Sequence, residues 1–199
     1  MAHIDYYFSL LSSFTYLAGD RFAQIAADHG ATVRYKPFDI LTLFDRTGAP
    51  RPAQRAEGRK LYRMQELKRF AAKLDKPMKF EPAFWPTNVA PASYAVLAAQ
   101  EAGGGDLDGL VQRLLTAVWE EDKNIADDAV ITEALEASGF DPMLSMTGML
   151  KGAEVYARNL EDALLTGVFG SPFYIVTDTD ERFWGQDRLD DLDAYLATL

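Results

Sequence analysis

Two adjacent hydroxyl side chains, Ser12 and Ser13, lie where a strand-like stretch meets a helix-like one. Apolar and polar residues alternate over residues 4–9, which predicts a strand, and apolar residues recur at helical spacing over residues 13–29, which predicts a helix. A strand that turns directly into a helix leaves the first helical amides unpartnered, and these amides favour an anion. The hydroxyls can therefore be helix caps or donors to an anion. With two available, Ser13 can cap while Ser12 faces solvent.

The scarcity of other reactive side chains narrows the chemistry further. The chain has 199 residues, no cysteine and two histidines, His3 and His29. The lack of cysteine excludes disulfides, Cys-ligated metals and a thiol nucleophile belonging to the protein. Two isolated histidines argue against a Ser-His-Asp triad and against a zinc site, so we predict no metal centre.

Charge and hydropathy restrict the partners and the location. The formal net charge is −10, which argues against a nucleic-acid partner, because such a protein needs a positive surface. No apolar run is long enough to span a bilayer, and no secretory signal is recognisable, so we expect no membrane partner and a cytoplasmic location. One segment is basic, and we interpret most of its charges as a solvated helix face: Arg55, Arg59, Lys60, Arg63, Lys68 and Arg69.

The order of the expected elements predicts the fold. A second strand at residues 32–38 completes a βαβ unit, and residues 39–52 look irregular. Helical patterns follow at residues 55–74, 91–102, 107–121, 127–138, 141–148 and 153–166. Strand character returns only at residues 173–176 and 182–184, before a last helix at 189–199.

This order is that of an α/β protein with a thioredoxin-like fold and a large all-helical domain inserted after the first βαβ unit. Strands from both ends of the chain would then share one sheet. We therefore assign residues 1–40 plus 155–199 to a thioredoxin-like domain and residues 41–154 to the inserted helical domain.

Several stretches together resemble one known family. The strand and turn over residues 4–18 are similar to the opening of the 2-hydroxychromene-2-carboxylate isomerases, relatives of kappa-class glutathione transferases and of DsbA-type oxidoreductases. The resemblance covers nearly the whole chain and continues at residues 33–35, 60–62, 67–71 and 118–119. It is most specific at residues 168–172 and 183–189.

The resemblance implies a thiol chemistry in which the sulfur comes from outside. Ser12 and Thr15 occupy the places of the two cysteines in the Cys-x-x-Cys motif of the oxidoreductases, so disulfide exchange is impossible. The family uses glutathione, and Ser12 would be the catalytic residue, donating a hydrogen bond that lowers the pKa of the glutathione sulfur. The implied activity is a glutathione-dependent cis-trans isomerisation of 2-hydroxychromene-2-carboxylate or a related aromatic-degradation intermediate, by reversible thiolate addition to a C=C bond.

The resemblance also implies which residues bind the two ligands. Glutathione would contact Ser12, Gln54, Ser171, Pro172, Trp184, Gly185, Gln186 and Asp187, with the Ser171–Pro172 bond cis rather than in the commoner trans form. The aromatic substrate would contact Phe44, Asp45, Gln54, Phe84 and Trp85. For Phe84 and Trp85, packing over the domain interface is an equal alternative, and Trp119 is predicted to lie in the core.

Four positions depart from the family pattern and keep other functions open. Ser13 stands where the family has proline, Ser171 replaces a branched apolar residue, and Gln54 and Gln186 replace asparagine. One alternative is a kappa-like glutathione transferase or peroxidase, which would consume glutathione. Another is a non-catalytic thiol or peptide binder that uses the edge at the cis-proline. We also expect a homodimer, because relatives of this family are dimeric.

Overall fold

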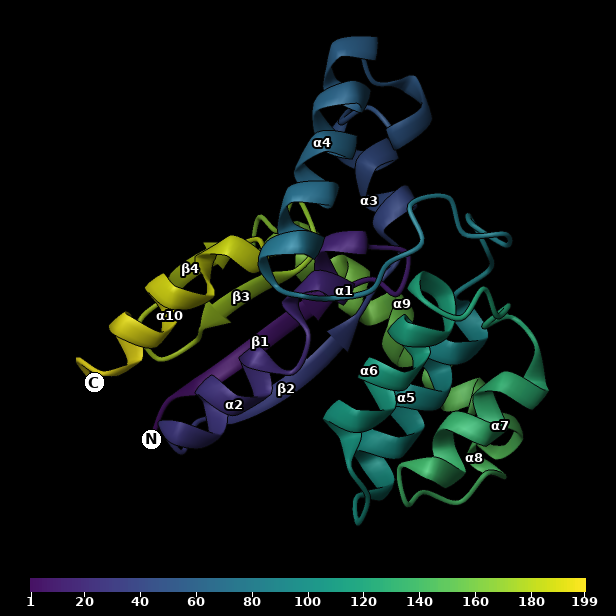
Figure 1. The fold of residues 1–199 in the computed structure, drawn as a ribbon. Helices are drawn as coiled ribbons and strands as arrows, with labels where there is room; N and C mark the ends of the chain where they lie inside the picture. Colours follow the sequence, from purple (N-terminus) through teal and green to yellow (C-terminus); the bar gives the residue numbers. More distant parts are fainter.

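The computed structural model, which describes all 199 residues, is built on one four-stranded sheet (Figure 1). The strands are β1 (His3–Phe8), β2 (Thr32–Pro37), β3 (Phe173–Val176) and β4 (Glu181–Trp184). Their order across the sheet is β2-β1-β3-β4, with β1 parallel to β2 and antiparallel to β3. Strands from both ends of the chain therefore share one sheet, as the sequence predicts.

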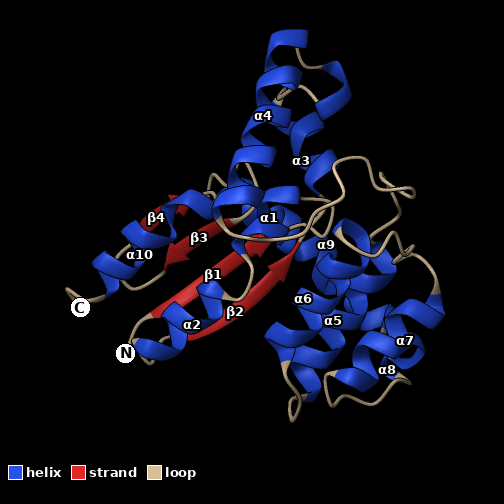
Figure 2. Ribbon diagram, in the orientation of Figure 1, coloured by secondary structure: helices blue, strands red, loops and turns tan.

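Helices surround the sheet and form most of the molecule, as Figure 2 shows. They are α1 (Ser13–Ala18), α2 (Arg21–Asp28), α3 (Ile40–Thr47), α4 (Glu57–Lys73), α5 (Ala90–Ala102), α6 (Leu107–Trp119), α7 (Asp128–Ala137), α8 (Leu144–Thr147), α9 (Met149–Leu165) and α10 (Leu189–Leu196). Two short 3-10 turns, η1 (Pro52–Gln54) and η2 (Gln186–Arg188), complete the set. Helix α4 projects from the body with α3 beside it (Figure 1).

Two sequence predictions about the helices are wrong. The helix predicted over residues 13–29 is two helices, because Gly19 adopts a positive φ of 59° and its amide closes α1 on the Tyr16 carbonyl. The stretch predicted as irregular, 39–52, contains α3. The Asp39 carboxylate caps this helix by accepting from two backbone amides, and Gly48 ends it in the left-handed conformation.

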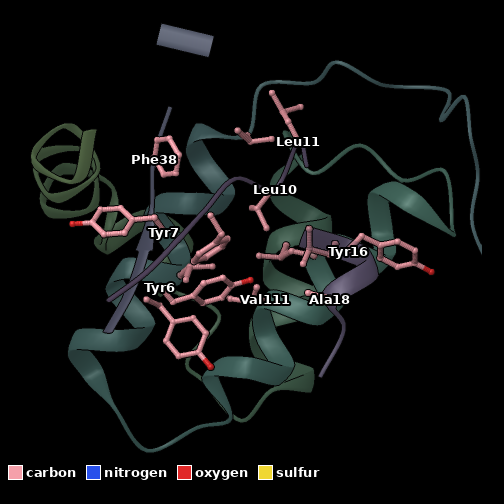
Figure 3. Packing of buried hydrophobic residues seen from close by; sticks show 14 of the residues in the cluster. Tyr6, Tyr7, Leu10, Leu11, Tyr16, Ala18, Phe38 and Val111 are labelled. Atoms are coloured by element: carbon pink, nitrogen blue, oxygen red, sulfur yellow. The ribbon is translucent and has the colours of Figure 1, made fainter. Parts of the chain in front are cut away.

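The hydrophobic core runs through the sheet and the helical block without interruption. One cluster of 44 buried residues includes side chains from β1, β3, α5, α6 and α7. On β1, the Tyr6 ring stacks on Tyr174 of β3 at a centroid distance of 5.1 Å, and Figure 3 shows Tyr6 close to Val111 of α6. Trp119 is 2% exposed, which confirms its predicted place in the core. The division at residues 40 and 155 stays a prediction, and α9 crosses the second of these positions.

Side-chain amides from the helical block close the outer edge of the sheet. The Gln100 side chain accepts from the Tyr35 amide at 2.8 Å and donates to the Tyr35 carbonyl at 3.1 Å. Asn159 donates to the carbonyl of Pro37, a residue with no N–H of its own, at 3.0 Å. These bonds satisfy backbone groups that an edge strand otherwise exposes, and they fix the block beside β2.

Neither histidine lies near the turn that carries Ser12. His3 contacts the Asp178 carboxylate, and His29 contacts Asp193. No three histidine, aspartate or glutamate side chains are grouped so that they could hold a metal ion. None of the helices has both the length and the apolar character that a membrane crossing requires.

Candidate active site

The turn between β1 and α1 presents the Ser12 hydroxyl in a defined hydrogen-bonding arrangement. Ser12 is the N-cap of α1, since its Oγ accepts from the Thr15 amide at 3.2 Å. The same hydroxyl donates to the Ser171 carbonyl at 3.0 Å, across 159 residues of sequence. Of the two serines that the sequence offers as caps, Ser12 caps the helix, and it is also partly exposed.

Ser13 turns inward and connects the turn to the projecting helix α4. It is fully buried, and its Oγ accepts from the Arg63 guanidinium at 2.8 Å. The same guanidinium lies over the ring of Phe14, 5.9 Å from its centroid. A proline at position 13 could not accept this hydrogen bond. The serine that replaces the family's proline therefore makes a contact with Arg63 that proline could not make.

The loop before β3 lies directly against this turn. Its Ser171–Pro172 peptide bond is cis, as the resemblance implies. The Ser171 carbonyl receives the Ser12 hydroxyl, and the Ser171 N–H makes no hydrogen bond within the chain. The Pro172 carbonyl accepts from the amide of Gly185 at 3.0 Å, which brings the end of β4 to the same place.

Residues 184–187 form the third segment of the site. Trp184 is 50% exposed, and its ring meets Phe169 edge to face at 4.8 Å. Gly170 has no room for a side chain, because a Cβ there would lie 2.2 Å from the indole Nε1 of Trp184. Gly185 has a φ of 107°, and the Asp187 carboxylate folds back so that a Cβ on Gly185 would lie 2.5 Å from it. Glycine at positions 170 and 185 thus leaves room for the side chains of Trp184 and Asp187.

The side chain of Gln186 faces the interior, unlike its neighbours. It is 1% exposed, and its Oε1 accepts from the Arg21 guanidinium at 3.2 Å. Its Nε2 is buried without a hydrogen-bond partner. What residue 186 can offer to the site is its backbone, because its side chain is buried.

The predicted substrate residues from α3 and η1 lie near one another. Phe44 is buried, and the Arg55 guanidinium covers its ring at 5.4 Å. Asp45 is exposed and accepts from the Nε of Arg51 at 2.7 Å. The Gln54 side chain is exposed, and its Oε1 accepts from the Arg51 amide at 3.1 Å.

The two predicted substrate aromatics between α4 and α5 differ in their placement. The indole Nε1 of Trp85 donates to the Leu11 carbonyl at 3.1 Å, so Trp85 lies beside the turn that carries Ser12. Its ring is 6.1 Å from that of Trp119. Phe84, by contrast, is 52% exposed. The chain has a second cis peptide bond here, Trp85–Pro86, which sequence reasoning missed.

Two arginines near the site were missed as functional candidates. Arg55 and Arg63 form no ion pair, whereas Arg69 on the same helix as Arg63 pairs with Glu66. Burial and repulsion from Arg55 lower the pKa of Arg63, and burial and repulsion from Arg59 lower that of Arg55. The solvated-face interpretation, which we give for most of the six basic residues, does not apply to these two. For Arg63 the sequence contained a signal. Arg59 and Arg63 are like charges four residues apart on one helix, a spacing at which they repel each other.

Comparisons with known proteins bear on this arrangement. The family of DsbA-like thioredoxin domains matches residues 3–197. A 2-hydroxychromene-2-carboxylate isomerase of Pseudomonas putida is 30% identical over 98% of this chain and 95% of its own. The kappa 1 glutathione S-transferase of Caenorhabditis elegans is 25% identical over 94% of this chain and 88% of its own. A solved 2-hydroxychromene-2-carboxylate isomerase superposes with a TM-score of 0.79 at 26% identity, covering 98% of this chain and 95% of that one.

Proposed function

We propose that this chain, which belongs to the 2-hydroxychromene-2-carboxylate isomerase family of DsbA-like thioredoxin domains, is a glutathione-dependent cis-trans isomerase. Its substrate would be 2-hydroxychromene-2-carboxylate or a related aromatic-degradation intermediate. One observation carries the proposal: the Ser12 hydroxyl lies 3.0 Å from the Ser171 carbonyl, where the cis-proline loop meets the β1–α1 turn. In a chain without cysteine, this junction holds a hydroxyl donor where the oxidoreductases have a thiol.

The backbone groups at this junction fit a peptide thiol such as glutathione. The N–H of Ser171 is unpaired, and its carbonyl carries a hydrogen bond only from a side chain that can rotate. Together they offer the donor and acceptor of a strand edge to an extended ligand. The backbone amides of Gln186 and Asp187, at the start of η2, offer further donors suited to a carboxylate.

The Ser12 side chain is suited to stabilise an anion and not to attack a substrate. Glutathione, when bound, supplies a sulfur anion that adds reversibly to a C=C bond and leaves after rotation about the resulting single bond. The Ser12 hydroxyl can turn from the Ser171 carbonyl to an anion beside it, favouring the charged form. No base contacts Ser12, so its own oxygen has no means of activation. The dipole of α1 adds little, because that helix has six residues.

The other side of the site supports an aromatic, anionic electrophile. The Arg55 guanidinium covers the Phe44 ring, and the Arg63 guanidinium reaches Ser13, which follows Ser12. Neither guanidinium has a carboxylate partner in the chain. A half-buried cation is stabilised when a bound anion acts as its counterion. We propose that a carboxylate on the electrophile takes this place.

A kappa-like glutathione transferase or peroxidase is a second candidate, favoured by the similarity to the kappa 1 transferase of Caenorhabditis elegans. It would share the thiolate site and consume glutathione. A non-catalytic thiol or peptide binder would share the Ser171 edge and convert nothing. The cytoplasmic location and the homodimer stay predictions within this proposal.

The proposal is tested by incubating the protein with glutathione and 2-hydroxychromene-2-carboxylate and following both. We expect the substrate to reach equilibrium with its isomer while glutathione is recovered unchanged. Stoichiometric loss of glutathione would favour the transferase. Calorimetric binding of glutathione without any conversion would leave the thiol binder, and no binding at millimolar glutathione would overturn the proposed cofactor.

A further inference from the structure

A second hydroxyl, that of Ser171, belongs to a small cluster at the same junction. Its Oγ accepts a hydrogen bond from the Ser9 amide at 2.9 Å. It also lies 2.9 Å from the Oγ1 of Thr15, and either oxygen could be the donor. The cluster thus joins the cis-proline loop to the end of β1 and to α1.

The burial of Thr15 decides which hydroxyl donates. Thr15 is fully buried, and the Ser171 hydroxyl is the sole hydrogen-bond partner of its Oγ1. If Ser171 donated, the Thr15 proton would have no acceptor in a dry environment, which is costly. Thr15 is therefore the donor and Ser171 the acceptor.

This direction leaves the proton of Ser171 uncommitted. Its Oγ accepts from the Ser9 amide and from the Thr15 hydroxyl, and a hydroxyl oxygen has two acceptor sites. Both are filled, and the remaining O–H has no acceptor within the chain. Ser171 is partly exposed, so this proton can reach a ligand.

The free proton lies next to the position of Ser12. Thr15 bonds both serines, since its amide donates to the Ser12 Oγ at 3.2 Å and its hydroxyl bonds the Ser171 Oγ at 2.9 Å. The amide nitrogen and the hydroxyl of one residue are close neighbours, so the two serine oxygens lie on the same side of the junction. The Ser12 proton is engaged with a carbonyl, whereas that of Ser171 is not.

We propose that the Ser171 hydroxyl is a second donor to the glutathione sulfur anion, acting together with Ser12. The inference rests on the proposed function and adds a side-chain role to a residue otherwise expected to act through its backbone. Thr15 and Ser9 act as positioning residues, because they hold the Ser171 oxygen so that its proton points away from the core.

The test measures the thiolate fraction of bound glutathione against pH, from its ultraviolet absorbance. We compare the wild type with Ser171→Ala, with Ser171→Val, which introduces the branched apolar type usual in the family, and with Ser171→Thr, which keeps the hydroxyl. Loss of a hydrogen bond to a charged group should lower the thiolate fraction at neutral pH about tenfold in the Ala and Val variants. Ser171→Thr should restore it.

A control ligand separates this role from a structural one. S-methylglutathione has no ionisable thiol, so any change in its affinity in Ser171→Val measures altered packing of the site, and the change for glutathione at neutral pH should exceed it. An unchanged thiolate fraction in Ser171→Ala and Ser171→Val would overturn the inference, as would a rise in that fraction in Thr15→Val, which would mean that Ser171 donates to Thr15. If the wild type binds no glutathione, the proposed function itself fails.

Discussion

The two sides of the site satisfy their polar groups in opposite ways. The hydroxyl wall, defined by Ser12, Thr15 and Ser171, is neutral, and hydrogen bonds within the chain fix its oxygens. The arginine wall, defined by Arg55 and Arg63, is charged and has no counterion. Hydroxyls whose oxygens are held in place need only rotate an O–H bond to meet an anion, whereas unpaired cations gain most from a ligand that brings a charge. The first wall is thus suited to a reacting sulfur and the second to recognition of the electrophile.

The largest expected effect comes from removing the central donor of the hydroxyl wall. Ser12→Ala should lower glutathione-dependent turnover by about 10²–10³-fold, the usual effect of losing one preorganised donor. Steady-state kinetics with 2-hydroxychromene-2-carboxylate would measure it. Ser12→Thr is the matched control, since it keeps the hydroxyl and the cap. Full turnover in Ser12→Ala would remove the distinction between the two walls.

A smaller and more selective effect is expected from the arginine wall. Arg63→Met should raise the KM for a carboxylate-bearing electrophile about tenfold, because one charge-assisted hydrogen bond is lost. The KM for the methyl ester of the same compound should not change. Arg69→Met is the control, since Arg69 pairs with Glu66 on the same helix. Equal effects on acid and ester would show that Arg63 acts only through Ser13.

A third half-buried charge, Asp108 on α6, sharpens the comparison because it can lose its charge. Burial raises its pKa to about 6, while the Tyr35 hydroxyl donates to it at 3.3 Å. A carboxyl with a raised folded-state pKa binds its proton more tightly when folded, so stability falls as pH rises from about 4 through about 6. Asp108→Asn should therefore be more stable than the wild type by about 1–2 kcal/mol at pH 8 and similar at pH 4.

Urea unfolding of both proteins at several pH values would check this prediction. A difference that does not depend on pH would mean that Asp108 stays ionised when folded, as the arginines do. In that case the contrast between the permanently charged Arg55 and Arg63 and an Asp108 that loses its charge would not hold.

The smallest expected effect concerns the indole that supports the turn. Trp85→Phe removes the hydrogen bond to the Leu11 carbonyl, and the free energy of unfolding should fall by about 1 kcal/mol. Phe84→Leu is the comparison, since Phe84 is 52% exposed and should change stability by less than about 0.5 kcal/mol. Thermal unfolding would measure both. Equal losses would contradict the different roles given to these adjacent aromatics.

The sequence by itself determined the strands and, through the order of its elements, the sheet that joins both ends of the chain. Alternation over residues 4–9 and the short apolar run at 173–176 are local signals, and both strands form as expected. The lack of cysteine likewise excludes disulfide exchange whatever fold the chain adopts. These conclusions depend on residue types and on neighbours in sequence, so the sequence suffices for them.

Only the tertiary structure decided what each site residue does. Ser12 and Ser13 are the same residue type in the same turn. The Ser12 hydroxyl donates to the Ser171 carbonyl, 159 residues away, whereas Ser13 is buried and accepts from Arg63, 50 residues away. The inward turn of Gln186 depends in the same way on Arg21, 165 residues away. A hydroxyl or an amide takes its role from whichever partner folding brings within hydrogen-bond distance, and local pattern does not contain that information.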